Sequence, residues 1–125
     1  MPFPYHDRFW REVAEFLKKH QRPGESIVAP DEFIGEFADV HPYAAASVAR
    51  DSAWVWFVVH KGLFDRIDPG FLAEPKAMGT AVFANEVFVA FTHQAGWREL
   101  DVCSRHYSAY LVQLAALRSQ SAGEG

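Results

Sequence analysis

Cysteine, basic charge and long apolar runs are all scarce in this chain of 125 residues. The single cysteine, Cys103, excludes an internal disulfide and fits a reducing compartment. The formal net charge of −4 gives the chain no overall attraction for nucleic acid. No apolar run approaches the ~20 residues of a membrane-spanning helix, and residues 1–5 lack the features of a secretory signal. These absences predict a soluble, cytoplasmic protein that binds neither membranes nor nucleic acid.

Motifs that bind metals or nucleotides are also missing. Cys103 and His106 form one C-x-x-H pair, but no second pair stands at the spacing of a zinc site. A dinucleotide or S-adenosylmethionine site needs glycines in the turn after the first strand. Here that turn contains no glycine, and it places two carboxylates, Asp31 and Glu32, where an anionic group would bind. We therefore expect no metal and no cofactor.

Apolar residues, in contrast, are abundant. They make up 50% of the chain, and 15% of the residues are aromatic, which is enough to build the core of one compact domain. We expect a single α/β domain over residues 1–118. Residues 119–125 have little to bury and are expected to fray.

Hydrophobic spacing predicts about four helices. Residues 7–20 carry apolar side chains at three-and-four spacing on one face, with Asp7 as the N-cap. A final helix begins after Ser104 and places tyrosine and leucine side chains on one face. A short helix is expected over residues 31–37, and one or two short helical turns, broken at residues 68–70, are expected within residues 63–72.

Short apolar stretches predict about five strands. Residues 54–59 are continuously aromatic and β-branched, which is typical of a central strand covered on both faces. Residues 26–29 and 40–44 are expected to form two further strands. Two more lie within residues 80–91, where Asn85 and Glu86 form the turn of a tight hairpin.

This order of elements predicts a small three-layer α/β fold with a mostly parallel sheet that ends in an antiparallel hairpin. Between about residues 25 and 92 the topology resembles a shortened Rossmann-like domain, including the methyltransferase-type variant that ends in a hairpin. The resemblance is architectural and covers no diagnostic motif. It implies that a site would lie beyond the carboxyl ends of the strands.

Polar side chains follow the predicted strands at this edge. They are Asp31 and Glu32 after the first strand, His60, Lys61 and Gly62 after the central strand, and Asn85 and Glu86 at the hairpin turn. His60 titrates near neutrality, and Asp31 or Glu32 could orient it for acid/base catalysis, while the other four are candidate ligand-binding residues. Each also has a purely structural interpretation. Asp31 suits a helix cap, Asn85 a turn, Lys61 an exposed surface and Gly62 a positive φ.

Some aromatic residues are not needed for the expected core. Tyr5 and Trp10 stand near the start of a helix whose buried face is already supplied by other residues. Aromatic side chains outside a core are enriched at protein contacts. The leading hypothesis is therefore an accessory or binding module that acts through self-association or a protein partner. The alternative is a small enzyme or transferase-like domain that binds a small molecule in the strand-end crevice and uses His60.

Overall fold

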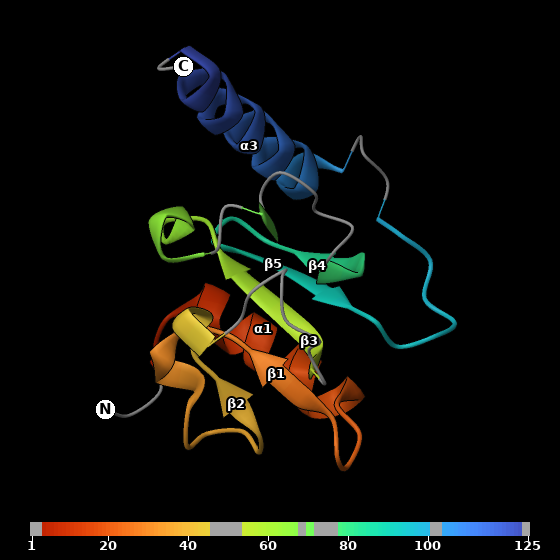
Figure 1. Ribbon diagram of the computed structural model, residues 1–125. Helices are drawn as coiled ribbons and strands as arrows, with labels where there is room; N and C mark the ends of the chain where they lie inside the picture. The colour runs from red at the N-terminus through yellow and green to blue at the C-terminus, as the bar shows by residue number, and fades with distance from the viewer. Residues whose placement is uncertain (1–3, 46–53, 68–69, 72–77, 101–103, 124–125) are drawn as a thin grey trace.

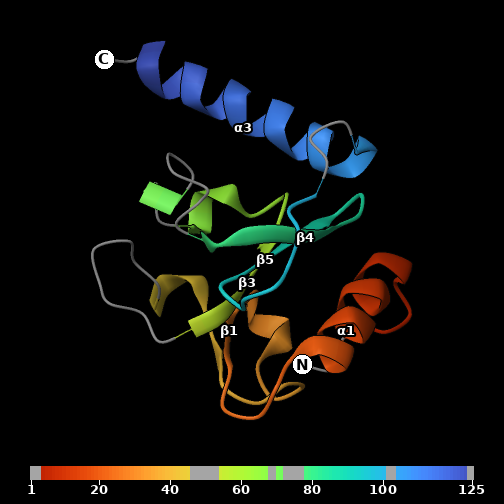
Figure 2. The same cartoon turned by 90° about the vertical axis from the view of Figure 1, so that its right-hand side faces the viewer.

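The computed structural model describes residues 4–45, 54–67, 70–71, 78–100 and 104–123 (Figure 1). Five strands form one sheet in the order β2-β1-β3-β5-β4. The strands are β1 (Ser26–Val28), β2 (Val40–His41), β3 (Trp54–His60), β4 (Thr80–Ala84) and β5 (Phe88–Thr92). Helix α1 (Arg8–His20) covers one face of the sheet and helix α3 (Arg105–Gly123) covers the other (Figures 1 and 2). No helix in the described part of the chain is long and apolar enough to cross a membrane.

The predicted Rossmann-like fold is wrong, because the sheet is mixed rather than mostly parallel. Strand β1 pairs in parallel with β2 and β3, whereas β5 pairs antiparallel with both β3 and β4. The reason lies in the hairpin, whose second strand, β5, and not its first, docks against β3. Strand β4 runs in the same direction as β3 but lies beyond β5 at the edge of the sheet, so the neighbour of β3 is the antiparallel strand β5.

The prediction of about four helices is also wrong, since the described residues contain two α-helices. The helix expected over residues 31–37 is a single 3₁₀ turn at Asp31–Phe33. Within residues 63–72, the described residues form a 3₁₀ turn at Phe64–Arg66 and helical backbone at Gly70 and Phe71. The first turn ends at Ile34, which is extended, and Gly35 after it adopts a φ of +90°, which is incompatible with a continued helix. Ile67 is extended, which ends the turn at Phe64–Arg66. Residues 68–69 and 72–77 of this region lie outside the described part, as do residues 46–53 and Cys103.

Other elements match their local signals. Helix α1 begins one residue after Asp7, whose carboxylate accepts hydrogen bonds from the backbone N–H groups of Phe9 (2.9 Å) and Trp10 (3.5 Å). Strand β3 is central, and the β4–β5 hairpin turns at Asn85. The segment predicted over residues 40–44 forms the short strand β2 and then a 3₁₀ turn at Tyr43–Ala45. Helix α3 continues to Gly123, into the segment expected to fray.

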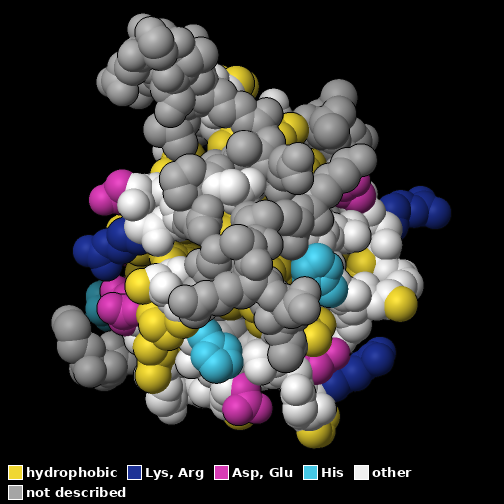
Figure 3. Space-filling view, in the orientation of Figure 1, with side chains coloured by type: hydrophobic (Ala, Val, Ile, Leu, Met, Phe, Trp, Pro, Cys, Tyr) yellow, Lys and Arg dark blue, Asp and Glu magenta, His cyan; other side chains and the backbone are white. Residues whose placement is uncertain are grey.

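The core has two halves, one on each face of the sheet. Trp56 and Val58 of β3 pack with Val13 and Leu17 of α1. Alternate residues of the same strand point the other way, into a cluster with Tyr107, Tyr110 and Leu114 of α3. Side chains of a strand alternate between faces, so burial on both faces explains the unbroken apolar sequence of β3. On the face in Figure 3, acidic and basic side chains are interspersed around the edge.

Candidate functional site

The carboxyl end of β3 and the β4–β5 turn lie at the same edge of the sheet. His60 stands opposite Phe88 in the β3–β5 register. The backbone N–H of Lys61 donates to the carbonyl oxygen of Val87 at 2.8 Å, and its Nζ donates to that of Asn85 at 2.8 Å. The fold therefore brings together residues that the sequence placed at two separate strand ends.

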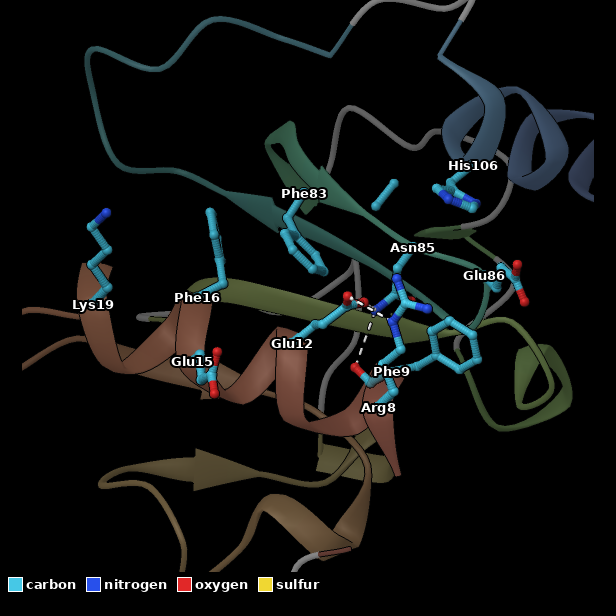
Figure 4. A pocket seen from close by; sticks show the side chains of 11 residues that line it. Arg8, Phe9, Glu12, Glu15, Phe16, Lys19, Phe83, Asn85, Glu86 and His106 are labelled. Atoms are coloured by element: carbon cyan, nitrogen blue, oxygen red, sulfur yellow. Dashed lines mark hydrogen bonds and ion pairs between the residues drawn. The ribbon is translucent and has the colours of Figure 1, made fainter. Parts of the chain in front are cut away.

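The predicted site residues are nevertheless divided between two cavities. Asp31 and Glu32 line a cavity of about 950 Å³, which we call the strand-end cavity. Asn85 and Glu86 line a groove of about 530 Å³ between α1 and β4, which we call the α1–β4 groove (Figure 4). His60 at the end of β3 and the next two residues, Lys61 and Gly62, line neither of them.

His60 is half-buried between aromatic rings. Its ring centroid lies 5.6 Å from that of Trp10 and 5.1 Å from that of Phe88. Its Nδ1 accepts a hydrogen bond from the N–H of Gly62 at 2.9 Å, which leaves the proton of the neutral ring on Nε2. Burial lowers the pKa of His60, although the charge of Glu32 acts in the opposite direction. The imidazole is therefore neutral at neutral pH, and its acid/base role stays a prediction.

Lys61, expected on an exposed surface, is buried. Besides its bond to Asn85, its Nζ donates to the carbonyl oxygen of His106 in α3 at 3.0 Å, and burial lowers its pKa. The carbonyl oxygen of Lys61 accepts a hydrogen bond from the side chain of Gln113 at 3.0 Å. Lys61 thus joins the end of β3 to both the hairpin and α3.

Asn85 is occupied by internal hydrogen bonds as well. Its Oδ1 accepts from the N–H groups of Val87 (2.9 Å) and Phe88 (2.8 Å), which closes the hairpin turn. Its Nδ2 donates to the carbonyl oxygen of Phe9 (3.1 Å) and to the carboxylate of Glu12 (3.2 Å). The structural interpretation as a turn residue therefore accounts for Asn85, which also holds α1 against the hairpin.

The α1–β4 groove has an apolar floor and a charged rim (Figure 4). Phe9 and Phe16 of α1 and Phe83 of β4 are all partly exposed, and the rings of Phe16 and Phe83 lie 4.9 Å apart. The rim carries Arg8, Glu12, Glu15, Lys19, Glu86 and His106. Helical spacing identified Phe9 and Phe16 from the sequence, but nothing local indicated that Phe83 would meet them.

The strand-end cavity is built around Tyr43, which sequence reasoning missed. The Tyr43 hydroxyl donates to the carbonyl oxygen of Val58 and accepts from the N–H of His60 at 3.0 Å. The hydroxyl thereby supplies hydrogen-bond partners for backbone groups of β3 that lie beyond the end of the neighbouring strand β1, which stops at Val28 before Pro30. Tyr43 is buried, and this burial raises its pKa.

The lining of the strand-end cavity is mainly apolar with three charged side chains. Asp31 and Arg66 are exposed and Glu32 is half-buried. Pro30, and not Asp31, stands at the N-cap position of the turn, so the expected capping role of Asp31 is not seen. The apolar lining consists of Pro30, Ile34, Pro42, Ala44 and Leu63, beside Tyr43.

A polar cluster at the opposite end of β3 ties a loop to the core. Glu25 accepts hydrogen bonds from the indole N–H of Trp56 (3.0 Å) and from the amide of Gln94. Gln94 in turn accepts from the indole N–H of Trp97 at 2.6 Å. Desolvation acts to raise the pKa of Glu25, but hydrogen bonds from Arg22, Trp56 and Gln94 outweigh it and lower the pKa. This cluster is structural.

The aromatic residues that suggested a partner surface pack against the rest of the chain. Trp10 contacts the rings of Phe33 at 5.7 Å and Phe88 at 4.9 Å. The hydroxyl of Tyr5 forms hydrogen bonds with Glu36 and Lys18. These two residues therefore do not supply an exposed aromatic patch, and the expectation of a partner depends on other surfaces.

Neither a search for clustered metal-binding side chains nor comparison with known proteins adds an assignment. Within the described residues, no three histidine, cysteine or carboxylate side chains gather in an arrangement that would hold a metal ion. No protein-family model, curated protein or solved structure matches the chain.

Proposed function

We propose that the protein is a binding module that receives a segment of a protein partner in the α1–β4 groove. The observation that carries this proposal is the meeting of three partly exposed phenylalanine rings, Phe9, Phe16 and Phe83, in one groove. An apolar centre surrounded by a polar rim is the usual anatomy of a protein interface, and aromatic side chains are enriched there. A groove of about 530 Å³ has room for a few side chains of a partner.

The charges on the rim favour a partner segment that combines apolar and basic residues. Within the described residues, the two ion pairs join Arg8 to Glu12 and Lys18 to Glu36. The carboxylates of Glu15 and Glu86 form no ion pair with any described residue, and the rim has a net charge of −1, because its three carboxylates outnumber Arg8 and Lys19. Lysine or arginine side chains beside an apolar anchor would pair with these two carboxylates. Such pairs on a rim contribute mainly to association rate and specificity.

The test is a selection of random peptides displayed on phage against the purified protein, followed by fluorescence anisotropy with the selected peptides. We expect peptides with a leucine or phenylalanine anchor beside lysine or arginine. E86K should weaken their binding at least tenfold through like-charge repulsion, and F83S should weaken it through loss of apolar contact. D65K is the matched control, because Asp65 is exposed and lies outside the groove.

Two results would count against the proposal. One is equal binding of the selected peptides to the native protein, E86K and F83S. The other is selection of acidic peptides. Light scattering after size-exclusion chromatography tests whether a second copy of the chain occupies the groove. A dimer that E86K dissociates would show that the chain supplies its own partner segment.

A further inference from the structure

We propose that the strand-end cavity is a second binding site, which takes a small molecule with one ammonium group and an apolar body. The cavity of about 950 Å³ shares no lining residue with the α1–β4 groove. Its volume lies within the range of small-molecule sites. It also lies beyond the carboxyl ends of the parallel strands β1 and β2, where open sheets commonly bind ligands. The inference is therefore independent of partner binding in the groove.

The walls of this cavity are held in place by the protein itself. The hydroxyl of Tyr43 is bonded to β3, so one wall cannot move without breaking buried hydrogen bonds. The turn that carries Asp31 is closed by a bond from the N–H of Phe33 to the carbonyl oxygen of Pro30 at 3.0 Å, and Phe33 is fully buried. The turn that carries Arg66 is closed by similar bonds. A preformed site loses little free energy to ordering when a ligand binds.

An apolar side chain is left uncovered inside the cavity. Ile34 is 48% exposed and is one of two large hydrophobic residues in the described part of the chain that are exposed to this degree. It lines the cavity together with Pro42 and Leu63. Burial of apolar surface contributes roughly 25 cal/mol per Å², so an apolar ligand body placed against these side chains would be stabilised.

The charged side chains determine the sign of the ligand. Asp31 and Glu32 form no ion pair with any described lysine or arginine. With Arg66 they give the lining a net charge of −1, since two carboxylates face one guanidinium. A ligand with a single ammonium group neutralises this charge and can donate charge-assisted hydrogen bonds to the carboxylates. An anion of the same shape meets like charge.

Three probes of the same shape and different charge test the proposal. They are 2-phenylethylamine, 2-phenylethanol and 3-phenylpropionate, titrated into ¹⁵N-labelled protein. We expect saturable shifts of the backbone amides of residues 31–34 and 63–66 with the amine, with a millimolar or lower Kd. The alcohol should bind more weakly, and the carboxylate should cause no saturable shift. Equal binding of the amine and the carboxylate, or no saturable binding of the amine, would overturn the proposal.

Single substitutions then locate the charge contacts. D31N and E32Q should each weaken amine binding at least threefold, because each removes one acceptor for the ammonium group. D65N is the control, since it removes the same charge from an exposed residue that does not line the cavity. The amide spectrum of each variant also reports whether it is folded. If folded D31N and E32Q bind the amine as tightly as D65N does, the assignment of these carboxylates is refuted.

Discussion

The hydroxyl of Tyr43 offers a sharp test of how the sheet is completed beyond the end of β1. Tyr43→Phe removes one oxygen atom and retains the ring, which stacks on Phe57 with a centroid distance of 5.8 Å and an interplanar angle of 13°. The substitution leaves the carbonyl oxygen of Val58 and the N–H of His60 without the partner that the hydroxyl supplies. Both backbone groups belong to the central strand β3.

The size of the effect follows from the cost of unpaired buried polar groups. Each such group costs about 1–3 kcal/mol, and partial access of water through the cavity reduces this, so we expect a loss of about 2–3 kcal/mol in the free energy of unfolding. An unfolding entropy of about 0.26 kcal/mol/K for a chain of 125 residues converts this loss to a fall in Tm of about 8–11 °C. Thermal denaturation followed by circular dichroism measures the shift directly.

Tyr107→Phe is a matched control. Tyr107 is also buried, but among the described residues its hydroxyl makes one hydrogen bond, of 3.3 Å, to the carboxylate of the exposed residue Glu99. Its loss should lower the free energy of unfolding by about 0.5–1 kcal/mol, or Tm by about 2–4 °C. Equal shifts for the two variants would refute the role of Tyr43 as a partner for the β3 backbone.

Three further predictions concern other parts of the chain. Gly79 has a φ of +105°, and an added Cβ would lie 2.3 Å from the carbonyl oxygen of Thr92, so Gly79→Ala should lower the free energy of unfolding in urea by more than ~1 kcal/mol. A smaller effect would mean that the backbone there can shift. The ring of Trp97 packs on the rings of Phe16 and Trp56, at centroid distances of 5.7 Å and 6.1 Å. Trp97→Ala should therefore lower the free energy of unfolding by about 2 kcal/mol, which is less than the loss for a fully buried tryptophan. The rate of proteolysis between residues 93 and 100 should rise in the same variant. The pKa of Glu25 lies below its usual value of 4.5 in the folded protein, so its contribution to stability is present above pH 4.5 and is lost as the pH falls through the folded pKa. The free energy of unfolding of E25Q, measured against pH, should therefore fall less steeply than that of the native protein below pH 4.5, and identical slopes would contradict this.

Features that depend on a few neighbouring residues were predictable. Helix α1 follows from an N-cap at Asp7 and apolar side chains at helical spacing. The hairpin follows from Asn85, whose side chain closes its own turn. Strand β3 follows from its unbroken run of apolar residues, which is typical of a strand in a sheet that is covered on both faces. Each of these signals arises within one segment, so no knowledge of the rest of the fold was needed.

Contacts between distant segments were decided only by the tertiary structure. The docking of β5 against β3 made the sheet mixed, because the sequence of a hairpin does not state which of its strands meets the sheet. The expected site was divided for a different reason. His60 and Lys61 are adjacent in the chain, yet His60 packs against Trp10 of α1 and Lys61 binds α3, because successive side chains at a strand end point to opposite faces.

The sequence by itself thus determined helix α1, the start of helix α3, the central strand β3 and the β4–β5 hairpin, and that polar residues stand at the carboxyl ends of strands. The tertiary structure decided the strand order, the two separate cavities and the contact of Tyr43 with the backbone of β3. Those features depend on which surfaces pack together, and packing is a property of the whole chain rather than of any segment within it.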